Sequence, residues 1–209
     1  MRMVTVLLAA GESSRMGEPK LLLPHEGKPL FLAALEPALA ASEQVVLVTG
    51  WYHEQIVRAV EPYLLAYPER LVIARNGEPA RGQFSSTLLG VRKIPRGTDF
   101  CIAMADAPLI TERHYRTLVD LLGTCEAVRP FCDGIPGHPV LCAATLRQEI
   151  LRQPSESSMR QFLSDRDVRR HDTDDPAWIT DIDTPMAYQQ LLRRAHPCVP
   201  SGSDDLHRT

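Results

Sequence analysis

The sequence predicts an α/β protein built on a mostly parallel sheet. Over the first 105 residues, short apolar runs rich in Val, Leu and Ala alternate with longer segments of helical periodicity. A turn containing Gly, Asn or Asp follows each of these runs. Continuous apolar runs of this length are typical of strands that are buried on both faces. Strand–helix–strand connections are right-handed, so successive strands are expected to lie parallel in one sheet.

The elements of this sheet follow in order along the first half of the chain. Strands are expected at Val4–Ala10, Gln44–Gly50, Arg70–Arg75 and Asp99–Ala105. Helices are expected between them, at Pro29–Ala41, His53–Tyr67 and Phe84–Lys93. Ligands bind beyond the carboxyl ends of the strands in such sheets. We therefore expect the loops at Gly11, Thr49, Asn76 and Asp106 to share one edge and one site.

The second half predicts an extension of the same domain. A helix is expected from Thr111 to Leu122, and two strands at Ala127–Phe131 and His138–Cys142 are expected to extend the sheet, with an antiparallel direction as one option. Further helices are expected at Ala143–Arg152, Ser157–Leu163 and Pro185–Arg194. Residues 195–209 are rich in Pro, Ser and Asp and predict a weakly structured tail. The organisation is thus one domain over residues 1–194 and a tail over 195–209.

Composition limits the classes of function. The chain has 209 residues, 44% of them hydrophobic, and a net charge of −3, which gives no electrostatic reason to expect a nucleic-acid or membrane partner. No apolar stretch approaches the roughly 20 residues of a transmembrane helix, and we expect a cytoplasmic protein. The five cysteines form no Cys-x-x-Cys pair, so we expect neither a zinc site nor a disulfide framework.

The loop after the first strand predicts a polyphosphate site. It contains Gly11 and Gly17, and adds the cations Arg15 and Lys20 to a segment rich in backbone N–H donors. A P-loop is excluded because Gly17 is followed by Glu18, and the dinucleotide-binding motif is excluded because position 13 is a serine. An ordinary Gly-Ser turn is the alternative.

A carboxylate at the same sheet edge predicts a divalent-cation site, and a pair of aspartates near the end of the domain is a second candidate. Asp106 follows a buried strand directly, where a magnesium ion would accept one or two carboxylates together with phosphate oxygens. Asp181 and Asp183 lie two residues apart, so they share a face if that segment is extended. The alternatives are an Asp106 that caps the turn before Pro108, and a helix N-cap ahead of Pro185.

Five separated motifs resemble those of the nucleotidyltransferases related to the molybdenum cofactor enzymes. The first is Leu8-Ala9-Ala10-Gly11-Glu12-Ser13-Ser14-Arg15-Met16-Gly17-Glu18-Pro19-Lys20. The others are the Asp106 segment, Asn76 with Gly82-Gln83-Phe84-Ser85-Ser86, the segment Gly134-Ile135-Pro136-Gly137-His138-Pro139, and Asp181-Ile182-Asp183-Thr184-Pro185. In relatives the positions of Ile135 and Pro136 often include arginine. The resemblance implies a three-layer α/β/α, Rossmann-like nucleotidyltransferase fold.

The resemblance also assigns roles to individual residues. Arg15 and Lys20 are the implied catalytic cations, and Asp106 and Asp183 are the implied ligands of Mg²⁺. The implied nucleotide contacts are Leu8, Ala9, Ala10, Gly11, Asn76, Gly82, Ser85 and Ser86. The implied acceptor contacts are Gly137, His138, Pro139 and Asp181. For Ser85 and Ser86, plain helix capping is the alternative.

The implied reaction is transfer of CMP from CTP to the phosphate of molybdopterin carrying molybdenum, with release of pyrophosphate. The Ala-Ala-Gly form of the first motif resembles the cytidylyl branch more than the guanylyl branch. Alternatives are a guanylyltransferase that uses GTP, or a cytidylyltransferase for a sugar, polyol or choline phosphate. A non-catalytic carrier of a nucleotide or cofactor is an alternative of another class. A molybdoenzyme or its chaperone is the implied client.

Overall fold

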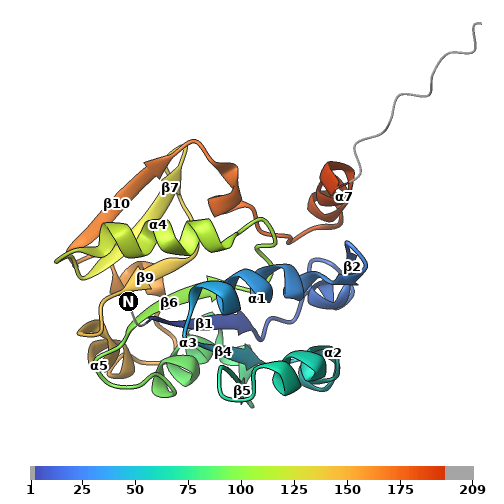
Figure 1. Ribbon diagram of the computed structural model, residues 1–209, viewed down its shortest axis with the longest axis horizontal. Coiled ribbons are helices and arrows are strands. Elements are labelled where there is room, and N and C mark those ends of the chain that lie inside the picture. Colours follow the sequence, from blue (N-terminus) through green and yellow to red (C-terminus); the bar gives the residue numbers. More distant parts are fainter. Residues whose placement is uncertain (1–2, 196–209) are drawn as a thin grey trace, which may run out of the picture.

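The fold is organised around one twisted, mixed sheet (Figure 1). The computed structural model describes residues 3–195, and within them the sheet has eight strands in the order β10-β7-β9-β6-β1-β4-β5, with β8 paired to β7. The strands are β1 (Met3–Ala9), β4 (Gln44–Thr49), β5 (Leu71–Arg75), β6 (Asp99–Met104), β7 (Ala127–Cys132), β8 (Ile135–Pro136), β9 (Val140–Cys142) and β10 (Val168–Thr173). The pairs β1–β4, β1–β6, β4–β5 and β7–β10 are parallel. Strand β9 is antiparallel to both of its neighbours, which confirms the antiparallel option.

Helices cover both faces of the sheet. They are α1 (Leu30–Ala41), α2 (His53–Ala66), α3 (Gln83–Arg92), α4 (Glu112–Leu122), α5 (Leu146–Leu151), α6 (Met159–Phe162) and α7 (Pro185–Ala195). Short 3-10 helices are η1 (Lys20–Leu22), η2 (Pro79–Arg81) and η3 (Pro176–Ile179). Buried side chains of α1, α2 and α4 join one core cluster, and those of α3, α5 and α6 join a second on the opposite face. The α/β/α architecture is therefore confirmed.

Strand β1 shows why its sequence is apolar without alternation. Met3, Leu7 and Ala9 pack into the first core cluster, while Val4 and Val6 pack into the second. Successive side chains of a strand point to opposite faces, so a strand covered by helices on both sides has no face left for polar residues.

The two-residue strand β8 was not predicted, and two further strand features were also missed. Strand β10 is a polar strand at the edge of the sheet and pairs only with β7. Its sequence is Val168-Arg169-Arg170-His171-Asp172-Thr173, and half of these residues are exposed. The hairpin of β2 (Pro24–His25) and β3 (Lys28–Pro29) has only two residues in each strand. Neither segment contains the apolar run or alternation from which strands are inferred.

Helix limits also differ from expectation at several ends. Helix α5 begins at Leu146 and not at Ala143, and α6 spans only Met159–Phe162, with the Ser158 side chain accepting a hydrogen bond from the backbone N–H of Gln161. Helix α7 includes Ala195, while the rest of the predicted tail, residues 196–209, lies outside the described residues. No helix among residues 3–195 is long and apolar enough to cross a membrane.

The C-terminal segment packs back against the carboxyl edge of the sheet. Ile182 and Leu191 are buried with Leu30 in a small third cluster, and the backbone N–H of Ile182 donates a hydrogen bond of 2.9 Å to the carbonyl oxygen of Asp106. This bond joins the segment that contains Asp181 and Asp183 to the loop after β6.

Candidate active site

The glycine loop after β1 has a defined backbone conformation. Ser13 and Gly17 have positive φ values of 60° and 73°, and the N–H of Met16 donates to the carbonyl oxygen of Ser13 at 2.9 Å. The Ser13 hydroxyl accepts a hydrogen bond from the backbone N–H of Lys20 at 3.3 Å. The loop therefore fixes the start of helix η1 and with it the position of the Lys20 side chain.

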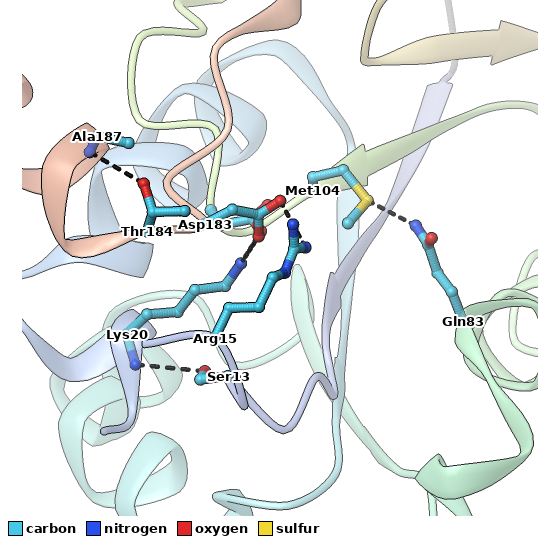
Figure 2. Close-up of polar contacts among 9 residues, drawn as sticks. Ser13, Arg15, Lys20, Gln83, Met104, Asp183, Thr184 and Ala187 are labelled. Carbon is cyan, nitrogen blue, oxygen red and sulfur yellow. Dashed lines mark hydrogen bonds and ion pairs between the residues drawn. The ribbon is translucent and has the colours of Figure 1, made fainter. Parts of the chain in front are cut away.

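A compact group of ion pairs lies beside this loop. Lys20 Nζ donates to Asp106 Oδ2 and, at 2.6 Å, to Asp183 Oδ1. Arg15 donates to the other oxygen of Asp183 at 2.8 Å, and Figure 2 shows both cations pointing to that carboxylate. The side chains of Lys20 and Asp106 are only 11% and 10% exposed, whereas that of Arg15 is 70% exposed.

The electrostatics of the cluster follow from burial and from these pairs. Burial lowers the pKa of Lys20, but the carboxylates of Asp106 and Asp183 outweigh it and raise that pKa overall. Burial disfavours the charged form of Asp183, yet the hydrogen bonds and charges of Lys20 and Arg15 hold its pKa below the ordinary value. Burial, and then the like charges of Asp106 and Asp183, raise the pKa of Asp181 to about 7. Three carboxylates thus lie close enough to repel one another.

A cavity of about 380 Å³ opens above this cluster. Eleven of the residues singled out in the sequence line it: Leu8, Ala9, Ala10, Gly11, Arg15, Lys20, Ser86, Asp106, His138, Asp181 and Asp183. The carboxyl ends of β1 and β6, the segment before β9 and the segment before α7 therefore meet at one cavity. Its volume falls in the range of small-molecule sites.

The other predicted contacts lie around the cavity and not in its wall. Asn76 and Ser85 line a separate, neighbouring cavity. The Asn76 side chain donates to the hydroxyls of Ser85 and Ser86, each at 2.9 Å, so Asn76 positions Ser86 at the site. Gly82 precedes helix α3, and Gly137 and Pro139 flank His138 without lining the cavity.

Several lining residues were not predicted from the sequence. The amide of Gln83 donates to the sulfur of Met104 at 2.8 Å (Figure 2), and Pro79 also lines the cavity. The position of Gln83 inside the motif that begins at Gly82 was the available signal. Gly50 was also missed: a Cβ there would lie 2.6 Å from the carbonyl oxygen of Ala10, so only glycine allows the loops after β1 and β4 to approach this closely.

The residues present fit a magnesium ion held partly by substrate. The Oδ1 atom of Asp106 is buried and has no hydrogen-bond partner among residues 3–195, and the repulsion at Asp181 would be relieved by a nearby cation. Within the same residues, no group of three or more His, Cys, Asp or Glu side chains is arranged around one point as a metal centre. Mg²⁺ commonly takes one or two protein carboxylates and completes its shell with phosphate oxygens and water.

Comparison with curated proteins gives relatives along nearly the whole chain. Molybdenum cofactor cytidylyltransferase of Escherichia coli K12 is 30% identical over 181 residues, which cover 86% of this chain and 90% of the relative. Purine catabolism protein PucB of Bacillus subtilis 168 is 29% identical over 92% of this chain and 97% of its own length. A probable molybdenum cofactor guanylyltransferase of Bacillus cereus is 26% identical over 90% of this chain and 94% of its own length.

A solved structure agrees with the fold, and a family model matches most of the chain. The manganese complex of Rv0371C from Mycobacterium tuberculosis H37Rv superposes with a TM-score of 0.73 over 92% of this chain and 99% of that one, at 23% identity. The model of the MobA-like NTP transferase domain matches residues 5–174, a range that holds the glycine loop, Asp106 and His138. The chain therefore belongs to the MobA-like NTP transferase family.

Proposed function

We propose that this protein is a cytidylyltransferase that transfers CMP from CTP to the phosphate of molybdopterin carrying molybdenum. A phosphate oxygen of the acceptor forms a bond to the α-phosphorus of CTP, the bond from that phosphorus to the bridging oxygen breaks, and pyrophosphate leaves. The observation that carries the proposal is the juxtaposition of Lys20 and Arg15 with Asp106 and Asp183 at a cavity under a glycine loop. The similarity to the cytidylyltransferase of E. coli supports the choice of substrates.

The chain's own residues supply alignment and charge. The acceptor phosphate is already anionic, so the reaction needs no strong general base. It needs reactants held in line and negative charge offset at the α-phosphate. Lys20 and Arg15 donate to phosphate oxygens of CTP, where they stabilise the charge that develops on the leaving pyrophosphate. The backbone of Ala10 and Gly11 and the hydroxyl of Ser86 hold the nucleotide.

Asp106 and Asp183 are the proposed ligands of a divalent cation, with Asp181 beside them. The ion would be Mg²⁺, and it supplies Lewis-acid polarisation of phosphate oxygens when bound. The manganese complex of the M. tuberculosis relative supports a divalent ion of this kind. His138, which lines the cavity between Gly137 and Pro139, is the proposed acceptor contact. A molybdoenzyme that receives the product stays a prediction.

The test is pyrophosphate release from CTP and from GTP, each with and without molybdenum-loaded molybdopterin. Release that requires CTP, the pterin and Mg²⁺ is expected. Release with GTP instead would favour a guanylyltransferase, an option kept open by the similarity to the B. cereus protein. No release with either nucleotide, despite nucleotide binding in a direct assay, would overturn the proposal and favour a carrier.

A further inference from the structure

An unpaired guanidinium lies on strand β7, one strand beyond the wall of the cavity. Arg129 is half-buried, and its Nε atom is shielded from solvent without a hydrogen-bond partner among residues 3–195. Burial, and then the positive charge of Arg160, lower the pKa of Arg129. A desolvated charged donor without a partner is costly, and the like charge of Arg160 adds repulsion. Both costs are reduced when an anion binds at Arg129.

The backbone places this guanidinium next to His138. The carbonyl oxygen of Pro130, directly after Arg129, accepts a 2.9 Å hydrogen bond from the N–H of Gly137, directly before His138. Burial, and then the charge of Arg129, lower the pKa of His138 to about 4, so the imidazole is neutral at pH 7. Its Nδ1 atom is buried without a partner as well. His138 itself lines the cavity, and the backbone hydrogen bond places Arg129 on the neighbouring strand, outside the residues that line it.

A second pair of contacts adds to the basic character of this region. Two guanidiniums lie over the ring of Phe131, that of Arg170 at 3.9 Å and that of Arg129 at 6.0 Å from its centroid. Arg170 is compensated by a 2.7 Å bond to Asp172. Neither Arg129 nor Arg160 forms an ion pair with any residue that the structure describes. The uncompensated charge is therefore concentrated at these two residues.

We propose that Arg129, with Arg160 and His138, forms a subsite for a second anionic group of the acceptor, separate from the phosphate that reacts beside Lys20. This inference rests on the proposed function, and it defines the acceptor class: a molecule that carries an anionic group at a distance from its reacting phosphate. A simple phosphate monoester would lack the group that Arg129 binds and would be a poor acceptor.

Kinetics of Arg129→Met test the subsite in the active enzyme. Methionine keeps much of the packing against Phe131 and removes the charge. Loss of a hydrogen bond to a charged group should raise the KM for molybdenum-loaded molybdopterin about 10- to 100-fold, while the KM for CTP stays within about twofold. Arg129→Lys keeps the positive charge on a compact ammonium group and should restore part of the affinity for the acceptor. Arg96→Met, which removes an exposed arginine at a different cavity, is the matched control and should behave as wild type.

An acceptor KM that does not change in Arg129→Met would overturn the subsite, as would an equal rise in both KM values. If the methionine variant does not fold, Arg129→Gln, which also removes the charge, decides by the same criterion. A purely structural role would lower the melting temperature without separating the two KM values.

A direct binding measurement separates this inference from the proposed function. The side-chain Nε–H signal of Arg129 is assigned in NMR spectra by its loss in Arg129→Lys. Sulfate is then titrated with CTP and Mg²⁺ at saturation, so that the glycine loop is filled. A sulfate-dependent shift of the Arg129 signal, with no shift at Arg96, is expected, and its absence would overturn the subsite. If no acceptor supports CMP transfer, the proposed function fails, and this titration alone still decides whether the anion subsite exists.

Discussion

Replacing Lys20 by methionine tests the ion-pair cluster at its centre. The substitution keeps the length of the side chain and removes the ammonium group shared by Asp106 and Asp183. Because the Asp106 side chain is only 10% exposed, water replaces the lost partner only in part. Removing one member of a buried ion pair costs about 3–5 kcal/mol. Asp183 is 35% exposed and keeps Arg15, so we expect the lower end, a loss of about 3 kcal/mol in the free energy of unfolding.

Urea denaturation at pH 7.5 without divalent ions measures this loss directly. In a protein of this size, about 3 kcal/mol corresponds to a fall of about 6–12 °C in Tm. The matched control is the double variant Lys20→Met, Asp106→Asn. It removes the unpaired charge of the Asp106 carboxylate at nearly constant side-chain shape and should recover most of the stability. The reasoning is refuted if the single variant lies within about 0.5 kcal/mol of wild type, the size of an ordinary surface substitution. It is also refuted if the double variant is no more stable than the single one.

Three further predictions address other parts of the molecule. Arg15→Ala should reduce pyrophosphate release about 100-fold or more and leave Tm almost unchanged, because the side chain is 70% exposed; full activity would exclude Arg15 from the mechanism. Gly90→Ala should cost about 1–3 kcal/mol in urea denaturation, since its Cβ would lie 2.2 Å from Cγ1 of Val6; wild-type stability would contradict the packing. Burial opposes ionisation of Glu36, but its hydrogen bond to Lys28 outweighs burial and holds the pKa of Glu36 below 4.5. The stability that the Glu36 carboxylate contributes is therefore present above pH 4.5 and is lost as the pH falls through the lowered pKa. The stability difference between wild type and Glu36→Gln should therefore shrink below pH 4.5, and an equal difference at pH 7 and pH 3 would count against it.

The fold was predictable where burial on both faces leaves a clear signal. The run from Val4 to Ala9 is apolar because helices cover both sides of β1, and the parallel direction of the first strands followed from the helices between them. Strand β10 has no such signal. Its residues pair through the backbone with β7 at the edge of the sheet, and an edge strand that is largely exposed needs no apolar side chains. Only the tertiary structure identifies it.

The site was predictable in its parts but not in its connections. Asp106 follows a buried strand, so its place at the sheet edge followed from topology alone. The role of Asp181 and Asp183 needed the family resemblance, because 75 residues or more separate them from Asp106 and no local pattern connects them. The hydrogen bond from Ile182 to the Asp106 carbonyl makes that connection. Likewise, nothing local indicates that Arg129 and Arg160 lie near each other.

The ion pairs explain how so charged a site is compatible with a stable fold. Three aspartates and two cations meet at one cavity, and an unpaired charge among them would cost several kcal/mol. In the protein alone, Lys20 and Arg15 neutralise Asp106 and Asp183, so most of that cost is avoided. In the proposed reaction, Lys20 and Arg15 would donate to phosphate oxygens, and Asp106 and Asp183 would hold a divalent ion. Each charged group then exchanges one partner of opposite sign for another. The nucleotide alone would leave the carboxylates unpaired, and the metal alone would leave the two cations unpaired, so nucleotide and metal should bind cooperatively.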